Sequence, residues 1–87
     1  MNIPIQMTST KCYKNINDIV IQDRFKKNMP SLEKILEHHQ DYLSTGYLDP
    51  IIVNSEDVLI DGYISYLIHK NYGHEKVQVY RIKVKTI

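Results

Sequence analysis

An 87-residue chain provides enough material for one domain with one modest hydrophobic core, which excludes a separate catalytic lobe. Hydrophobic residues make up 43% of the chain and charged residues 24%, which is ordinary globular usage and excludes extensive disorder. Eleven Lys and Arg face ten Asp and Glu, and the net charge of +1 is too small for strong long-range attraction to nucleic acid, so any phosphate contact has to be local.

The cysteine content and the lengths of the apolar runs predict the cellular location of the protein. Cys12 is the only cysteine, so no intramolecular disulfide can form, and no secretory leader is recognisable at the start of the chain. The longest apolar run, at residues 50–53, is far shorter than the roughly 20 residues needed to span a bilayer. We therefore expect a soluble cytoplasmic protein without a membrane partner.

The first part of the chain predicts an arm followed by a strand. Residues 1–10 are mostly polar and alternate only weakly, so we interpret them as an N-terminal arm or an edge strand, with the domain proper over residues 11–87. Residues 11–21 are rich in β-favouring side chains, but the stretch at residues 15–18 interrupts them with turn formers. This pattern predicts a strand and then a short turn.

An amphipathic helix is the clearest element in the chain. The polar and basic residues 22–28 lead to Pro30, and Asn28 or Ser31 can cap the amides of a helix that starts there. Side chains suited to one helix face then recur at steps of three and four residues: Leu32, Ile35, Leu36, His39, Tyr42 and Leu43. Gly46 is the predicted end of this helix.

A β-hairpin is predicted next. Residues 50–53 and residues 58–60 are short apolar runs, and the four residues between them are polar turn formers. Asp61 and Gly62 then break the second strand, so the hairpin is followed by a sharp turn.

The end of the chain predicts one more helix and one more strand. Residues 63–72 show apolar side chains at helical spacing, and Gly73 ends the helix. Residues 77–85 alternate between two faces, as a strand does. The element order is therefore β, α, β, β, α, β, which predicts an α+β fold: a single small domain with a mixed sheet and helices packed on it.

The second half of the chain resembles the ParB/sulfiredoxin-like domain. The resemblance rests on an ordered set of short features: GYLDPIIV at residues 46–53, VLIDGY at residues 58–63, a helix ending at Tyr72 and Gly73, and a strand with Val77 and Val79. With Ile19 and Arg24 upstream, it covers roughly residues 16–81. In this family the turn after the Asp-Gly pair presents helix amides to an anion, and partition proteins bind a cytidine nucleotide there while sulfiredoxins bind ATP.

The side chains with which these relatives react or grip phosphate are replaced in this chain. Sulfiredoxins place a cysteine directly after the glycine, where Tyr63 stands here, and the arginine that grips phosphate is replaced by Ser65. A lost charge-assisted hydrogen bond costs about 1.5–3 kcal/mol, so nucleotide binding at this turn should be weak. We therefore predict no sulfiredoxin activity and no catalytic residue, although the helix amides and the Ser65 hydroxyl can still hold a phosphate.

Two sets of residues are candidates for binding. The set for a nucleotide or phosphate is Asp61, Gly62, Tyr63, Ile64, Ser65 and Tyr66. The set for contact with nucleic acid or phosphate is Arg24, Lys26, Lys27, Arg81 and Lys83. Each set also has a structural interpretation, because Asp61 can cap the next helix, the tyrosines can pack around the core, and the basic side chains can be solvated or protect an edge strand.

The leading hypothesis is a non-catalytic ParB-like module that binds nucleic acid, a nucleotide or a partner protein, in the plasmid, phage or mobile-element setting that the resemblance implies. The four histidines do not fall at a metal-ligand spacing, so we predict no metal and no cofactor other than a nucleotide. One alternative is a phosphate-handling enzyme of nuclease or nucleotide-dependent kinase type that uses the Gly62 turn, and whether the protein is an enzyme stays open, with the balance against it. The other alternative is a protein-interaction domain or homodimer that uses the tyrosines and the last strand.

Overall fold

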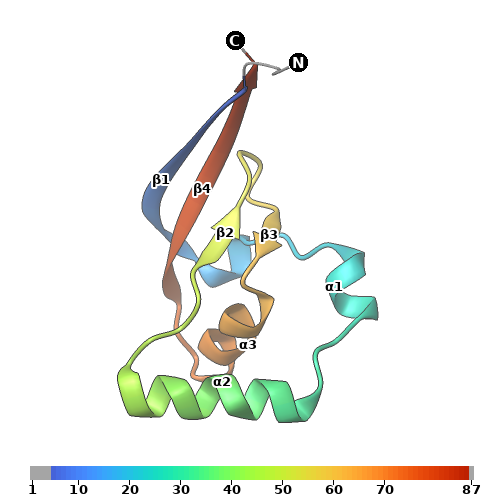
Figure 1. Cartoon of the computed structure of the whole chain (residues 1–87), viewed down its shortest axis with the longest axis vertical. Coiled ribbons are helices and arrows are strands. Elements are labelled where there is room, and N and C mark those ends of the chain that lie inside the picture. The colour runs from blue at the N-terminus through green and yellow to red at the C-terminus, as the bar shows by residue number, and fades with distance from the viewer. Residues whose placement is uncertain (1–4, 87) are drawn as a thin grey trace.

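In the computed structural model, residues 5–86 are described and form one four-stranded sheet with three α-helices (Figure 1). The elements in chain order are β1 (Ile5–Asn15), the short 3-10 helix η1 (Ile16–Asp18), α1 (Asp23–Lys27), α2 (Leu32–Thr45), β2 (Ile51–Val53), β3 (Leu59–Asp61), α3 (Tyr63–Asn71) and β4 (Lys76–Thr86). No helix within this part of the chain is long and apolar enough to cross a membrane.

The sheet is mixed, with the strand order β1-β4-β2-β3. β4 pairs antiparallel with β1 and parallel with β2, and β2 pairs antiparallel with β3. In Figure 1, α2 runs below α3, and α1 stands out beside β3, away from β1 and β4. The predicted α+β fold with a mixed sheet is therefore confirmed.

The core lies between the sheet and α3. The buried apolar side chains come from the η1 segment, from three strands and from α3: Ile16, Ile19, Ile51, Val53, Leu59, Tyr66, Ile68, Val77 and Val79. Along β4, Val77 and Val79 are buried while Gln78 between them is exposed, so the strand alternates as predicted. Burial of each aliphatic side chain contributes about 1.5–3 kcal/mol, which makes this cluster the main stabilising feature of the fold.

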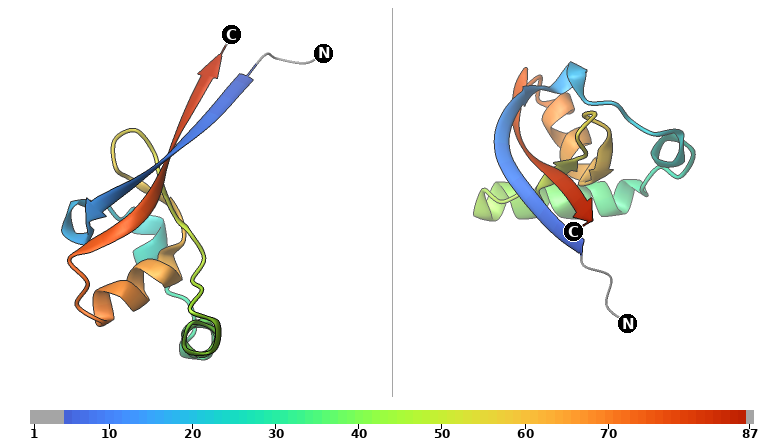
Figure 2. Two further views of the ribbon diagram at one scale, coloured as in Figure 1. Left: turned by 90° about the vertical axis from the view of Figure 1, so that its left-hand side faces the viewer. Right: turned by 90° about the horizontal axis from the view of Figure 1, so that it is seen from above.

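β1 and β4 continue beyond the rest of the sheet as a two-stranded ribbon (Figure 2). β2 pairs only with residues 79–81 of β4, so the outer part of β4 has β1 as its partner in the described chain. The face of β4 that carries Val79 continues with Arg81 and Lys83, and two threonines of β1 lie opposite them. These polar side chains suit a ribbon that no helix covers.

The ribbon decides between the two interpretations of the first ten residues. Residues 5–10 belong to β1 at the edge of the sheet, and the strand runs without a break through residue 11. This part of the chain is therefore an edge strand. Residues 1–4 of the expected arm lie outside the described residues.

Both predicted ends of α2 are confirmed. Ser31 Oγ accepts a hydrogen bond from the Lys34 amide at 3.2 Å, and Gly46 adopts the left-handed conformation (φ 74°) that ends the helix. The apolar face of α2 is less buried than the spacing of its apolar residues predicts. Ile35 and Tyr42 are half-buried, but no residue of α2 is fully buried.

α1 is a helix that the sequence did not predict. Its short sequence, DRFKK, carries no apolar repeat. Phe25 packs against the core, and Arg24 donates from Nη2 to the Ile60 carbonyl oxygen at 3.2 Å. Contacts with residues far along the chain therefore hold a helix that is too short to be stable by itself.

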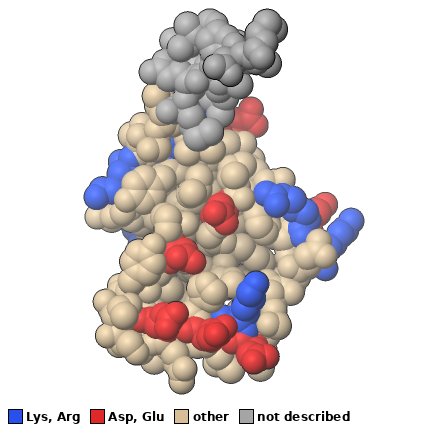
Figure 3. Space-filling model, in the orientation of Figure 1, with Lys and Arg blue, Asp and Glu red and all other residues tan. Residues whose placement is uncertain are grey.

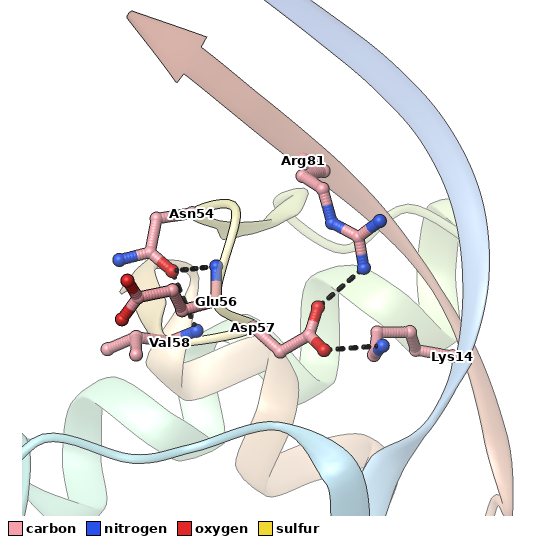
Figure 4. Close-up of polar contacts among 6 residues, drawn as sticks. All are labelled: Lys14, Asn54, Glu56, Asp57, Val58 and Arg81. Carbon is pink, nitrogen blue, oxygen red and sulfur yellow. Dashed lines mark hydrogen bonds and ion pairs between the residues drawn. The ribbon is translucent and has the colours of Figure 1, made fainter.

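Asp57, at the tip of the β2–β3 hairpin, ties the hairpin to the ribbon (Figure 4). Its carboxylate accepts hydrogen bonds from Lys14 of β1 at 2.7 Å and from Arg81 of β4 at 2.5 Å. Asn54 Oδ1 accepts from the amides two and four residues further on, and Asp57 sits in the left-handed region at φ 64°. The hydrogen bonds from Lys14 and then Arg81 lower the pKa of Asp57 below its usual value of 3.8.

Candidate ligand site at the Gly62 turn

β3 and α3 meet in a turn that only glycine fits. β3 ends at Asp61, Gly62 has a φ of 89°, and α3 begins at Tyr63. A Cβ at Gly62 would lie 2.3 Å from the Pro50 carbonyl oxygen and 2.9 Å from the Ile51 Cα, and these backbone atoms cannot move aside. The predicted strand–turn–helix unit is therefore confirmed, with the start of β2 closing one side of it.

Among residues 5–86 no side chain caps the first turn of α3. The expected cap, Asp61, instead accepts a hydrogen bond from the neighbouring Gly62 amide at 2.9 Å, so that expectation is wrong. The first intrahelical bond runs from the Tyr66 amide to the Gly62 carbonyl oxygen at 3.0 Å. The amides of residues 63–65 therefore have no partner within the helix, and with the helix dipole they favour an anion.

A cavity of about 410 Å³ opens over this turn. Residues 61–65 form one wall, α1 and α2 contribute Phe25 and His38, and the segment before β2 contributes Asp49 and Pro50. A volume of this size is typical of small-ligand pockets. The structure thus brings five of the six residues predicted for nucleotide or phosphate binding to one cavity, and Tyr66 is the exception.

Ser65 is a buried polar residue of the cavity wall whose hydroxyl lacks a hydrogen-bond partner among the described residues. Its side chain is 1% exposed, and its Oγ has no hydrogen-bond partner in the described part of the chain. A buried polar group without a partner costs about 1–3 kcal/mol, so native structures rarely keep one. Ser65 is one of the residues that line the cavity, but its Oγ has almost no accessible surface, so a ligand oxygen would reach this hydroxyl only after a small movement of the cavity wall.

The cavity wall carries two acidic side chains. Asp49 and Asp61 line it, and within the described residues no Lys or Arg does. His38 Nε2 lies 3.5 Å from Asp49 Oδ2, and its Nδ1 lies 2.9 Å from the Lys34 carbonyl oxygen, so both ring nitrogens have partners. Two carboxylates oppose a bare anion, and they favour a ligand that also carries hydroxyl or amino groups or brings a divalent cation with its phosphate.

Asp49 and His38 are absent from the predicted site. The place of Asp49 follows from the β2–β3 pairing, because the partners Ile52 and Asp61 bring the start of β2 beside the end of β3. The antiparallel pairing of β2 with β3 is therefore enough to predict that Asp49 lies near the Gly62 turn. The place of His38 depends on how α2 crosses below the sheet, which no local pattern fixes.

The five basic residues predicted to contact phosphate do not form one surface. They are divided between α1 and β4: Arg24, Lys26 and Lys27 on the first, and Arg81 and Lys83 on the second. In Figure 3 the basic side chains over α1 project at the right of the molecule, away from the ribbon. Arg24 lies 4.1 Å over the ring of Phe25, and Arg81 is bound to Asp57, while the three lysines are exposed.

The aromatic side chains near the turn pack against one another. Tyr66 lies in the core with 5% of its surface exposed, and its hydroxyl accepts from Lys70 Nζ at 3.2 Å. Tyr63 stacks on Tyr66 with ring centroids 6.0 Å apart and leans on Phe25 at 5.2 Å. These rings therefore have the packing role, whereas Tyr47 remains exposed.

A second polar cluster lies at the other end of α3. His69 Nδ1 and His74 Nδ1 are 2.9 Å apart, and the ring of Tyr72 stacks on His74 at 5.6 Å. The Tyr72 hydroxyl also bonds to His39 Nε2 of α2 at 2.5 Å. Burial, and then the charge of His74, lower the pKa of His69 below its usual value of 6.5. This cluster joins α3 to α2 and lies apart from the Gly62 cavity.

Comparison with known proteins identifies the fold. No protein-family model matches the chain, and no curated protein matches its sequence. Two solved structures of a pNOB8-like ParB N-domain match, one with a TM-score of 0.73 at 26% identity over 90% of this chain, the other with 0.71 at 27% over 88%. This chain spans 31% and 28% of the length of those two chains. The mixed sheet with its helices and these two matches together show that the chain is a ParB-N-like domain.

Proposed function

We propose that the protein is a non-catalytic ParB-like module that binds the phosphate of a nucleotide at the Gly62 turn. The observation that carries this proposal is the buried Ser65 hydroxyl, which belongs to the wall of the cavity and has no partner among the described groups. The amides of residues 63–65 belong to the same first turn of α3, and such helix amides favour an anion.

The nucleotide is favoured over inorganic phosphate because of the rest of the cavity. Asp49 and Asp61 can accept hydrogen bonds from sugar hydroxyls or base amino groups, which a free phosphate does not have. The cavity volume of about 410 Å³ also exceeds what a phosphate group fills. Affinity should be modest, because no guanidinium of the described chain lines the cavity.

The test is a calorimetric titration of the purified protein with a panel of nucleoside triphosphates and monophosphates, with and without Mg²⁺. Loss of a hydrogen bond to a charged group costs about 1.5–3 kcal/mol, so Ser65→Ala should weaken binding at least about tenfold. Ser44→Ala is the matched control, because Ser44 Oγ donates to the Gln40 carbonyl oxygen on the exposed side of α2. That control should bind like the unchanged protein.

Two outcomes would contradict the proposal. One is that no nucleotide binds at millimolar concentration. The other is that a nucleotide binds equally well to the Ser65→Ala variant, which would place the ligand elsewhere. Inorganic phosphate serves as a third ligand, and if it bound as tightly as every nucleotide, the part of the proposal that concerns Asp49 and Asp61 would be wrong.

The five basic residues support direct nucleic-acid binding less well. Arg81 is already bonded to Asp57, and Arg24 to the Ile60 carbonyl oxygen. The three lysines are exposed, and they belong to α1 and β4, which lie on different sides of the molecule in Figure 1. A nucleic-acid partner would therefore meet only a few of these charges at once.

A further inference from the structure

A second cavity lies where the chain passes from α2 to β2. β2 pairs with β4 from residue 51 onward, and the segment before it, residues 46–50, runs from the end of α2 up to the sheet (Figure 1). A cavity of about 520 Å³ lies between this segment and β4. Besides residues 46–51, its wall consists of Tyr42 of α2, His69 of α3, and Gln78 and Tyr80 of β4. We call it the tyrosine cavity.

Three tyrosines form the aromatic part of this wall. Tyr47 is 60% exposed, and Tyr42 and Tyr80 are half-buried. Tyr42 has an aromatic neighbour, the ring of Tyr72, with the two centroids 5.9 Å apart. Tyr47 and Tyr80 have none among the described residues. Because the face of a tyrosine ring carries partial negative charge, such rings attract a cation.

The same wall has a carboxylate and no cation. The Asp49 side chain is 58% exposed, and its Oδ2 lies 3.5 Å from His38 Nε2, so Oδ1 has no partner among the described residues. No Lys or Arg of the described chain lines the cavity. His69 has a pKa lowered by burial and by the charge of His74, which keeps its ring neutral at pH 7. The tyrosine cavity is therefore a place that favours positive charge.

We propose that the tyrosine cavity binds the guanidinium group of an arginine that belongs to a partner protein. Asp49 and the tyrosine faces both attract a cation, whereas a phosphate would be repelled by Asp49 and would find no basic side chain in the described wall. A guanidinium is favoured over an ammonium because it is planar, stacks on aromatic rings and donates two hydrogen bonds to one carboxylate.

An arginine within a polypeptide is favoured over free arginine. The free amino acid carries an α-carboxylate, which would enter the cavity region together with the guanidinium and would be repelled by Asp49. In a polypeptide this carboxylate is replaced by a neutral peptide group. Because Tyr47 lies at the surface, a side chain of a neighbouring molecule can reach the cavity from outside.

The proposal does not depend on nucleotide binding at the Gly62 turn. The two cavities share Asp49 and Pro50, but none of the three tyrosines lines the Gly62 cavity. A change at Tyr47 should therefore affect arginine binding and leave nucleotide binding unchanged.

The test is an amide NMR titration with capped five-residue glycine peptides that carry arginine, lysine or citrulline at the centre. Citrulline has nearly the shape of arginine without its charge. The arginine peptide should bind in the millimolar range, at least about tenfold tighter than the citrulline peptide and about threefold tighter than the lysine peptide. The largest shifts should fall on residues 46–49 and on Gln78 and Tyr80.

Variants of the wall test the two kinds of contact. Tyr47→Leu should weaken binding of the arginine peptide about three- to tenfold, whereas Tyr47→Phe, which keeps an aromatic ring, should bind like the unchanged protein. Asp49→Asn should weaken it about tenfold. Asp41→Asn is the matched control for the lost charge, because Asp41 is exposed on α2 and does not line the cavity.

Several results would overturn the proposal. These are no shift at 10 mM arginine peptide, as estimated from the affinity range above, equal binding of the arginine and citrulline peptides, or an unaffected Tyr47→Leu variant. Equal binding of the lysine peptide would overturn the choice of a guanidinium, and equal binding of free arginine would overturn the choice of a partner protein. A nucleoside that bound to the same amides more tightly than the arginine peptide would replace the proposal with base stacking.

Discussion

At the scale of single residues, Gly62 and Ser65 account for different properties of the same turn. Gly62 gives the turn its shape, because a Cβ there would meet the Pro50 carbonyl oxygen at 2.3 Å. Ser65 contributes a buried hydroxyl that no described group satisfies. Shape and proposed binding can therefore be tested at separate positions.

Ser65→Ala should make the free protein more stable. Removing an unsatisfied buried hydroxyl should raise the free energy of unfolding by about 1 kcal/mol. In a domain of this size, that is a rise in Tm of about 4–8 °C. Thermal and urea unfolding without nucleotide measure it. Lower stability in the variant would mean that the hydroxyl has a partner in solution.

Gly62→Ala should destabilise the fold much more than Gly46→Ala. Both glycines have positive φ, at 89° and 74°, but a Cβ at Gly46 would meet nothing within 4 Å. We expect a loss of about 1 kcal/mol at Gly46 from backbone strain alone, and at least about 3 kcal/mol at Gly62 from strain and overlap together. Urea unfolding of both variants compares them. Equal losses would show that β2 does not close the turn in solution.

At the scale of elements, the sequence predicted the ends of α2 better than its surroundings. Ser31 and Gly46 are local signals, and each acts where it was expected. α1 was missed because Arg24 and Phe25 hold it through contacts with distant residues. The exposed leucines of α2 were also unpredictable, since an apolar stripe does not reveal how much of it the neighbouring helix covers.

The end of α3 predicts a loss of stability on acidification. The pKa of His69 lies below its usual value of 6.5, first because of burial and then because of His74. The unfolded chain therefore binds more protons, so this contribution is fully present above pH 6.5 and is lost as the pH falls below it. His74→Gln should reduce this loss without abolishing it, because burial remains. Urea unfolding at pH values above and below 6.5 measures this loss of stability. The same pH dependence in His74→Gln and in the unchanged protein would contradict the prediction.

At the scale of the whole molecule, the order of the strands and of the two longer helices could be predicted, and so could the β2–β3 hairpin, but the place of β4 in the sheet could not. Alternation and helical spacing indicated the strands, α2 and α3. The place of β4 between β1 and β2 depends on pairs such as Ile5 with Thr86, which no local pattern specifies. The site shows the same division: residues 61–65 came from a local motif, whereas His38 and the unpartnered state of Ser65 appear only in the fold.

Asp57 ties the β2–β3 hairpin to β1 and β4, and these two ion pairs predict how the molecule responds to stronger acid. Lys14 and Arg81 lower its pKa below 3.8, so its contribution to stability is present above that value and is lost as the pH falls through the lowered pKa. Asp57→Asn should lose stability at neutral pH and show a weaker fall in strong acid. Asn also tolerates the positive φ of this position. Glu56→Gln is the control, and an equal acid response in Asp57→Asn and the unchanged protein would argue against the tie.

The most direct test of the proposed site is an amide NMR titration with nucleotide. The account predicts that the largest shifts fall on the amides of residues 63–65, whose N–H groups have no partner within the helix, and that Ser65→Ala removes most of the response. Shifts confined to the tyrosine cavity or the ribbon, with the first turn of α3 unmoved, would contradict it.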